Sequence, residues 1–331
     1  MFHLHSDSGG ADVEAVISPR AAALKALRVD GVDLVEPTTA SVDLPGMSGA
    51  VLVPWPNRVA GAVWEYDARP QYLENTEPEL GNANHGLLAD TTYNLIARDE
   101  SSITLSAPVH GRPGYPFTLA TQVRYSLGPE GLTVEHLIRN DGDETAPVAV
   151  GAHPYLRVGD SIVADLMLNI DAASAVILDA KTHLPVATVP VDAATDVRSG
   201  RRVADAVRHI CYTDLSADSD GRVRHTLTSA DGRATTVWAD HDFGWAQVWI
   251  TDQPPGGPGL AIAIEPMTAP PDALNSGAGL HWLAPGELWC PSWGISSNIT
   301  GTRDFDIRWD SDHGTCETAW QNKKDRRNRF L

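Results

Sequence analysis

The sequence predicts a large antiparallel all-β protein with few short helices. Glycine (28) and proline (23) are spread along all 331 residues, and the apolar runs between them are short. Turn residues at such close intervals are typical of many short strands. Convincing amphipathic helices of useful length are scarce. A chain of this length can form one large all-β domain or two ordinary domains.

Alternation of apolar and polar residues marks the expected strands. Leu24–Val35 holds Asp30–Gly31 between two alternating segments, which is a hairpin signal. In Leu132–Arg139 every second residue from Leu132 onward, His136 included, would share one face. The other expected strands are Tyr93–Ala97, Ser102–Ser106, Phe117–Ser126, Val148–Gly151, Ile162–Ile170, Ala175–Leu178, Val223–Thr228, Ala234–Trp238, Ala246–Thr251 and Leu260–Ile264.

In two segments the sequence is also compatible with a helix. Ser18-Pro19-Arg20 followed by AAALKAL could start a helix in place of the hairpin's first strand. Ala193–Val207 holds at most one amphipathic helix.

A change of composition near the C-terminus predicts a domain boundary. Residues 1–297 carry the strand pattern, whereas residues 298–331 are highly polar and finish in KKDRRNRFL. A block of this kind is more often solvated than folded. We therefore expect one β domain followed by a disordered polar tail.

Charge and cysteine usage narrow the partners and the compartment. The formal charge of −18 and the pI near 4.9 argue against nucleic acid and anionic membranes as partners. The three cysteines are few and widely spaced, which argues against a disulfide framework or a structural zinc site. No signal peptide and no apolar run of about 20 residues is visible. A cytoplasmic protein is the interpretation that fits best.

Four polar clusters interrupt the strand pattern. Pro54–Val59 (PWPNRV) is a stiff loop that presents Asn57 and Arg58. Asn82–Leu87 (NANHGL) places His85 before a glycine. Taken alone, each of these loops is more often an ordinary surface turn.

The other two clusters end apolar strands. Gly151–Leu156 (GAHPYL) presents His153 and Tyr155, and the strand Leu260–Ile264 ends with Glu265 against Pro266. A carboxylate held where water is scarce tends to have a raised pKa and can act as a general base. A histidine packed at a strand terminus and a glutamate that merely ends a strand are the more common interpretations of each stretch by itself.

Aromatic residues near one strand suggest a sugar ligand. Phe243–Trp249 (FGWAQVW) would put Trp245, Gln247 and Trp249 on one face. Aromatic faces with amides suit sugar rings, although an aromatic stripe in the core has the same pattern. No G-x-S-x-G, P-loop or H-E-x-x-H motif occurs, and no two histidines within the body have metal-ligand spacing on one element.

Taken in order, these stretches resemble the aldose 1-epimerase (galactose mutarotase-like) family, and its bacterial branch more than the animal galactose mutarotases. The resemblance covers roughly residues 11–297. It is carried by PNRV with a following glycine, NHGL, GAHPYL, IEPMTAPPDALN and the PGE-containing pair of strands in Leu283–Ile295.

The resemblance implies a large antiparallel β-sandwich, the supersandwich of this family, and the roles of several residues. Glu265 would be the general base and His153 the general acid. Arg58 and His85 would hold the sugar hydroxyls and ring oxygen. One departure stands out, because His209 occupies the position where the family commonly has an aspartate; Asp214 could replace it only if the strand register shifted.

The expected reaction is the interconversion of the α and β anomers of a free hexose such as glucose or galactose. One carboxylate and one imidazole suffice, so no cofactor and no metal are expected. Proximity would favour an ionised Glu265 beside a protonated His153. A hexose-6-phosphate mutarotase and a non-catalytic sugar-binding protein stay open as alternatives. The expected partner is a monosaccharide, and the protein would be a monomer or a homodimer.

Overall fold

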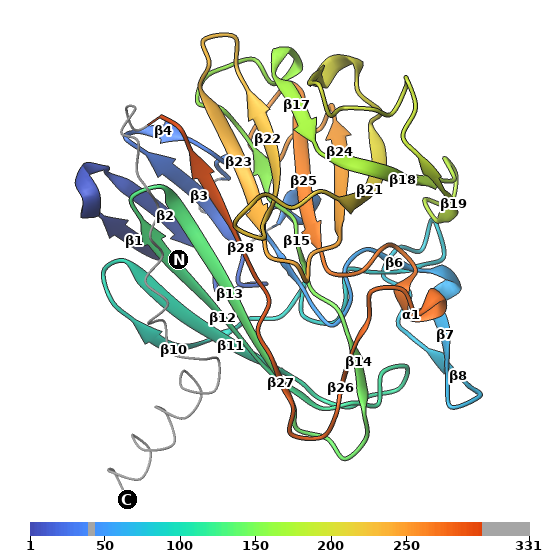
Figure 1. Ribbon diagram of the computed structural model, residues 1–331. Coiled ribbons are helices and arrows are strands. Elements are labelled where there is room, and N and C mark those ends of the chain that lie inside the picture. The colour runs from blue at the N-terminus through green and yellow to red at the C-terminus, as the bar shows by residue number, and fades with distance from the viewer. Residues whose placement is uncertain (39–43, 300–331) are drawn as a thin grey trace, which may run out of the picture.

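The computed structural model describes residues 1–38 and 44–299, which form antiparallel sheets joined by turns (Figure 1). The four-stranded sheet contains β1 (Phe2–Ser6), β2 (Val13–Ile17), β3 (Leu24–Val29) and β4 (Val32–Asp33). The ten-stranded sheet contains, in spatial order, β10 (Asn94–Arg98), β11 (Ser102–Val109), β12 (Leu119–Gly128), β13 (Gly131–Asn140), β28 (Ser292–Ser297), β23 (Ala234–Ala239), β22 (Val223–Thr228), β17 (Met167–Ile170) and β20 (Arg201–Arg202), with β27 (Leu288–Trp289) paired to β13.

The eight-stranded sheet carries the candidate site. In spatial order it contains β19 (Pro185–Pro190), β18 (Ala172–Leu178), β21 (His209–Leu215), β24 (Trp245–Thr251), β25 (Ala261–Met267), β15 (Gly151–Ala152) and β5 (Val51–Leu52), with β16 (Tyr155–Leu156) also paired to β25. Three two-stranded sheets are β14 (Ala146–Val148) with β26 (His281–Leu283), β6 (Arg58–Val59) with β9 (Ala83–Asn84), and β7 (Val63–Tyr66) with β8 (Arg69–Tyr72).

Helices within the described residues are short. One α-helix is present, α1 (Ala273–Ser276), together with five 3₁₀ turns, which are η1 (Ser8–Gly10), η2 (Pro45–Met47), η3 (Ala60–Ala62), η4 (Val163–Asp165) and η5 (Val203–Asp205). None of these is long and apolar enough to cross a membrane.

The two large sheets share one apolar core. Alternate apolar residues of β23 and β28, such as Val237 and Ile295, belong to the same cluster as Val248 of β24 and Ile264 of β25. The N-terminal strands lie beside β12 and β13 at one end of the molecule, and β18, β19 and β21 lie at the other (Figure 1). The predicted all-β fold is therefore confirmed.

The strand predictions agree with most of the structure. The hairpin at Asp30–Gly31 forms between β3 and β4, and both turn residues have a positive φ (49° and 75°) as a tight hairpin turn requires. In β13 the alternation is as expected, with His136 buried on the core face. Two predicted strands are split or shortened, since Val148–Gly151 divides into β14 and β15, and Ile162–Ile170 begins with the turn η4.

Both possible helices are absent. The segment after Ser18 continues through three fully buried alanines into β3, so its apolar residues serve a strand. Ala193–Val207 forms turns, β20 and η5 instead of a helix. After Ser18 helix propensity gives way because Leu24–Val29 pairs with β2.

The predictions for the cysteines and for the C-terminal boundary can also be compared with the structure. Cys211 is buried and free, whereas Cys290 is disulfide-bonded, although the spacing of the cysteines gave no reason to expect a disulfide. The last described strand, β28, ends at Ser297. Residues 300–331 of the predicted tail lie outside the described residues, and the boundary stays a prediction.

Candidate active site

One face of β24 and β25 packs into the core, and the other face carries the candidate site residues. Val248 and Ile264 point into the core, so Gln247 and Glu265 must point to the opposite face, because side chains alternate along a strand. Gln247 pairs with Glu265 across the two strands, and Cys211 of β21 pairs with Gln247 on the other side. These residues form one row across the sheet.

Glu265 lies inside β25, which corrects the expectation that it ends the strand. The strand continues through Pro266 to Met267. Here the neighbouring chain changes from β16 to β15, and Ile264 donates its N–H to the carbonyl of Pro154 in between (3.3 Å). A proline is tolerated because regular pairing is already interrupted at this point.

The same interruption places His153. This residue lies between β15 and β16, and its Nε2 is 3.4 Å from Oε1 of Glu265. Its ring stacks on Tyr155, with centroids 5.1 Å apart and planes at 27°. Tyr155 in turn donates its hydroxyl to the carbonyl of Gly46 (3.2 Å). The imidazole is thereby fixed against the carboxylate.

Burial determines the charges of this pair. Glu265 is 2% exposed, and burial raises its pKa to about 8 although the positive charge of Arg58 opposes the shift. Burial lowers the pKa of His153 to about 4, and Arg58 adds to the effect. Both shifts favour the neutral form of each group. Desolvation therefore opposes the ion pair that proximity is expected to favour.

Two atoms of the pair have no hydrogen-bond partner among the described residues. They are Oε2 of Glu265 and Nδ1 of His153. Buried polar atoms are nearly always paired, and an exception calls for an explanation such as a ligand or a catalytic role.

The loops of Asn57 and His85 meet above this sheet face. Each residue has a positive φ (59° and 62°), and the N–H of His85 donates to the carbonyl of Asn57 (2.9 Å). The N–H of Asn57 donates to Nδ1 of His85 (3.2 Å), so a neutral His85 carries its proton on Nε2. The His85 ring lies edge-on to His153 with centroids 5.5 Å apart.

Gly86 allows this approach. It has a φ of 76°, and a Cβ there would lie 2.3 Å from the carbonyl oxygen of Val53. Only glycine fits so near a neighbouring backbone. The NHG sequence thus lets His85 approach the site.

Asn57 and Gln247 connect the loops to the sheet. The amide of Asn57 donates to Oε1 of Gln247 (3.3 Å), and Gln247 donates to the carbonyls of Ile210 (2.9 Å) and Val248 (3.0 Å). Both side chains are almost completely buried. They hold the site together, and neither amide is free to turn toward a ligand without losing these bonds.

Arg58 is held by a residue that the sequence did not single out. Its Nε and Nη2 donate to the two carboxylate oxygens of Glu77 (2.8 and 2.7 Å), and both side chains are largely buried (11% and 15% exposed). Glu77 also accepts from the amide of Asn84 (3.4 Å). No motif marks Glu77, because its partner is recognised only once β6 and β9 have paired.

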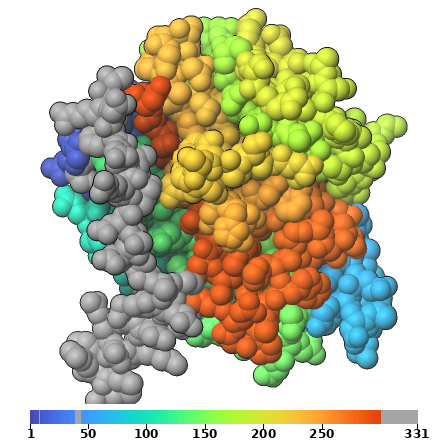
Figure 2. Space-filling model, in the orientation of Figure 1, coloured from blue at the N-terminus to red at the C-terminus, as the bar shows by residue number. Residues whose placement is uncertain are grey.

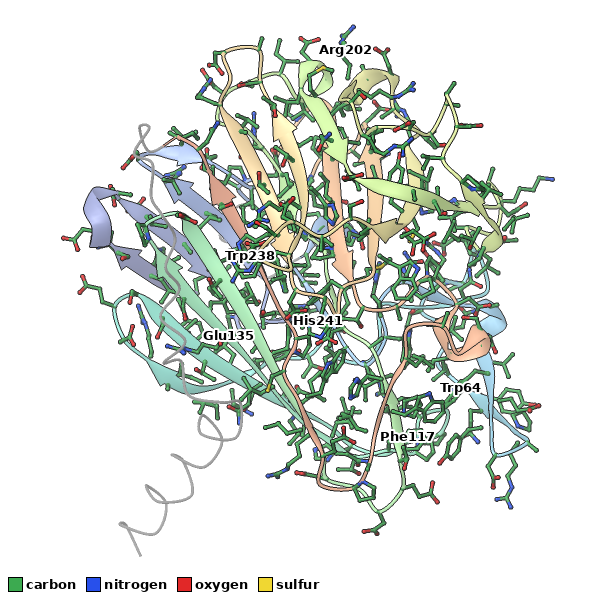
Figure 3. The ribbon with its side chains drawn as sticks, in the orientation of Figure 1. Trp64, Phe117, Glu135, Arg202, Trp238 and His241 are labelled. Atoms are coloured by element: carbon green, nitrogen blue, oxygen red, sulfur yellow. The ribbon has the colours of Figure 1, made fainter. Side chains whose placement is uncertain are left out.

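An aromatic cluster supports the loop of Arg58 from below. The ring centroids of Trp55 and Tyr115 lie 6.0 Å apart, and those of Trp64 and Phe117 lie 6.4 Å apart (Figure 3). Trp64 also donates its indole N–H to the carbonyl of Gly114 (2.7 Å). Figure 2 shows the β7–β8 hairpin (light blue) beside the orange surface that α1 belongs to, and α1 contacts β7. This packing makes the loop rigid.

His209 lies on the site face, one row further along the sheet. It pairs with Trp249, and its ring is edge-on to that of Trp249 with centroids 4.8 Å apart. Burial lowers its pKa to about 3. Asp214 is exposed with a φ of 52°, so it does not take the position of the aspartate that the resemblance leads one to expect.

A fourth imidazole, that of His183, was missed by sequence reasoning. Its ring centroid lies 4.7 Å from that of His209 and 6.2 Å from that of Trp249. It stands in a turn between two strands and has no local motif, so only the folded chain reveals it.

The core of the site could also hold a metal ion. One ligand atom each of His85, His153 and Glu265 lies within 4.8 Å of the others. Two imidazoles and a carboxylate are a donor set that zinc accepts. The sequence gave no sign of it, because the three residues come from three separate segments.

Comparison with known proteins identifies the family. The family model described as aldose 1-epimerase matches residues 4–291. The chain belongs to the aldose 1-epimerase family. It is also 33% identical over 277 residues to the uncharacterised protein YihR of Escherichia coli, an alignment that covers 83% of this chain and 87% of that protein.

Solved structures share the fold of this family member. A putative aldose 1-epimerase from Escherichia coli superposes with a TM-score of 0.74 at 19% identity, covering 89% of this chain and 98% of the other. An aldose epimerase homologue from C. elegans gives a TM-score of 0.75 at 17% identity, with the same coverage of both chains. These similarities confirm the galactose mutarotase-like sandwich that the resemblance implied.

Proposed function

We propose that the protein is a cofactor-independent aldose 1-epimerase that interconverts the anomers of a free hexose. The observation that carries the proposal is the buried contact between Oε1 of Glu265 and Nε2 of His153 (3.4 Å), with Oε2 of Glu265 lacking a partner among the described residues. Family membership supports an isomerase, and the geometry supplies an acid and a base side by side.

The reaction needs one proton taken and one given. A base removes the proton of the C1 hydroxyl while an acid protonates the ring oxygen O5, and the C1–O5 bond breaks to give the aldehyde. Rotation about C1–C2 and reclosure with the two roles reversed yields the other anomer. Each proton transfer contributes about 10²–10⁴-fold.

The directions of the two pKa shifts support this exchange, because the raised pKa of Glu265 and the lowered pKa of His153 both favour a proton on the carboxyl group before the sugar binds. Transfer across the 3.4 Å contact gives the ionised Glu265 and protonated His153 that the family roles require. A sugar whose C1 hydroxyl donates to the carboxylate would favour that form.

The surrounding residues would orient the sugar. His85 presents Nε2–H next to His153, and Tyr155 provides the stacking surface that holds the acid. Arg58, locked by Glu77, supplies a positive charge near both members of the pair. His209 and Trp249 form the wall beyond Gln247.

Polarimetry with glucose and galactose tests the proposal. We expect the wild type to accelerate mutarotation and Glu265→Gln to lose at least ~100-fold in kcat/KM. Glu287→Gln is the matched control, because Glu287 lies 3.7 Å from His281 in an exposed pair outside this sheet face. Equal rates for wild type and Glu265→Gln would disprove the base, and inactivity of the wild type would favour a non-catalytic sugar-binding protein.

Phosphorylated hexoses are disfavoured as substrates. A phosphate requires converging cationic donors, whereas both Nε and Nη2 of Arg58 are already bonded to Glu77. Saturation-transfer NMR of anomer exchange with glucose and with glucose 6-phosphate separates the two. Acceleration of the phosphate alone would reverse this preference.

The other expectations stay proposals. A cytoplasmic location and a monomer or homodimer remain predictions, which cell fractionation and sedimentation would test.

A further inference from the structure

The loop of residues 179–184 brings His183 over the aromatic row of the site. It joins β18, which ends at Leu178, to β19, which begins at Pro185. The rings of His183 and His209 are nearly perpendicular (83°) with centroids 4.7 Å apart. Trp249 lies beside both. The three rings form one aromatic cluster.

Two sets of hydrogen bonds hold this loop in place. The carboxylate of Asp179 accepts from the N–H groups of Lys181 and Thr182 (2.9 and 2.8 Å) and from the hydroxyl of Thr182 (3.0 Å). The side-chain amide of Asn82, which precedes the His85 turn, donates to the carbonyl of Thr182 (3.2 Å). The loop is therefore attached to the catalytic side of the site.

His183 itself has a strained backbone. Its φ is 58°, in the left-handed region that residues with a side chain rarely adopt. Such a conformation persists only where the surroundings impose it, and it is often found at functional sites. Its Nδ1 is buried and has no hydrogen-bond partner in the part of the chain that the structure describes.

The position of these rings relative to the acid–base pair follows from the strand register. His209 and Trp249 lie on the same sheet face as Gln247 and Glu265. Trp249 is two residues from Gln247 along its strand, which is roughly 7 Å, and His209, on the next strand, is roughly 12 Å from Glu265. The charge of Arg58 acts on His183 and His209 as well as on Glu265. A sugar whose C1 lies at Glu265 would extend its remote hydroxyls toward the imidazoles.

We propose that His183 is a specificity-determining residue, which together with His209 contacts the sugar hydroxyls remote from C1. A neutral imidazole offers one donor and one acceptor, and a hydroxyl group both donates and accepts. The imidazole pair therefore distinguishes hexoses by the orientation of those hydroxyls. This inference rests on the proposed function.

The test compares the preference for hexose epimers in variants. His183→Phe keeps a ring against His209 and Trp249 but removes both nitrogens, and His183→Gln restores a donor and an acceptor. We expect the ratio of kcat/KM for glucose and galactose to change by about fivefold to tenfold in His183→Phe, mainly through KM, and to recover partly in His183→Gln. His5→Phe is the control, since His5 lies in β1 of the separate four-stranded sheet and should leave the ratio unchanged.

The possible failures can be told apart. If the wild type accelerates no hexose, the proposed function is wrong and this inference falls with it. If the wild type is active and His183→Phe keeps the wild-type ratio, His183 has no part in specificity while the proposed function stands. A double variant with His209→Phe should show a smaller change than the product of the two single changes, because the two rings would act on the same part of the sugar.

Discussion

Two buried histidines of this protein look alike until their partners are compared. His136 in β13 and His153 beside β25 are 1% and 6% exposed, and burial lowers their pKa values to about 3 and about 4. Nε2 of His136 accepts from the indole of Trp293 (3.1 Å) on the core face of the ten-stranded sheet. His153 instead faces Glu265, and each of these two residues keeps an atom without a partner in the described chain.

The difference shows which feature distinguishes a candidate catalytic histidine from a histidine of the core. Burial and a shifted pKa occur in both places, so neither distinguishes an active site from a core. The distinguishing feature is a second titratable group at contact distance, with acceptor capacity left over for a ligand. Nε2 of His136 has its partner in Trp293, whereas Nδ1 of His153 and Oε2 of Glu265 have none among the described residues.

The largest expected effect separates the two histidines by activity. His153→Leu removes the acid and should lower kcat/KM for mutarotation at least ~100-fold. His136→Leu should keep activity within about twofold, because it touches no part of the sheet face that carries Glu265. Polarimetry on both purified variants measures this.

The free energy of unfolding should change in the opposite order, with His136→Leu destabilised more than His153→Leu. His136→Leu leaves the indole N–H of Trp293 unpaired and should lower the unfolding free energy by about 1–3 kcal/mol. If His136→Leu abolished mutarotation in a protein that unfolds like the wild type, the distinction between the two histidines would be wrong.

A second effect concerns the stability of the protein, which depends on pH through the pKa of Glu265. The folded-state pKa of Glu265, about 8, lies above its ordinary value of 4.5. Between these pH values the native state holds a proton that the unfolded chain has released, so stability is lost as the pH rises. Glu265→Gln removes this cost and should raise the unfolding free energy at pH 7 by about 3 kcal/mol.

The gain from Glu265→Gln should shrink as the pH falls and vanish below about 4.5. Denaturant unfolding at several pH values measures it. A variant less stable than wild type at pH 7 would mean that the carboxylate is not desolvated as the structure indicates.

The smallest effect is the pH dependence of catalysis. The active pair carries one proton, so kcat/KM should be flat between about pH 4 and about pH 8. Above that range the pair has lost its acid, and below it the base, so activity falls about tenfold per pH unit on each side. A profile that instead rises steadily from pH 5 to pH 9 would contradict the shared proton.

Much of the fold was predictable because strand periodicity is a local property. The alternation in β13, the hairpin at Asp30–Gly31 and the β24 strand with Gln247 are visible in a few consecutive residues. The helix left open as an alternative after Ser18 does not form, because local propensity competes there with pairing between β2 and β3, which no short window contains.

The candidate site divides in the same way. Glu265, His153, His85 and Arg58 stand in recognisable motifs, and the structure brings the first three together. Glu77 and His183 carry no motif. Glu77 meets Arg58 from 19 residues away, and Thr182 meets Asn82 from 100 residues away, so only the folded chain shows that they belong to the site.

The sequence by itself determined the all-β class and the faces of the strands and predicted the acid–base pair, because alternation and short motifs depend on neighbours in the chain. The tertiary structure alone decided in which direction the pKa values of that proposed pair shift, which carboxylate neutralises Arg58 and which imidazole faces His209. Desolvation and contact between distant segments fix all three, and both arise only when the sheets and loops have closed over Glu265.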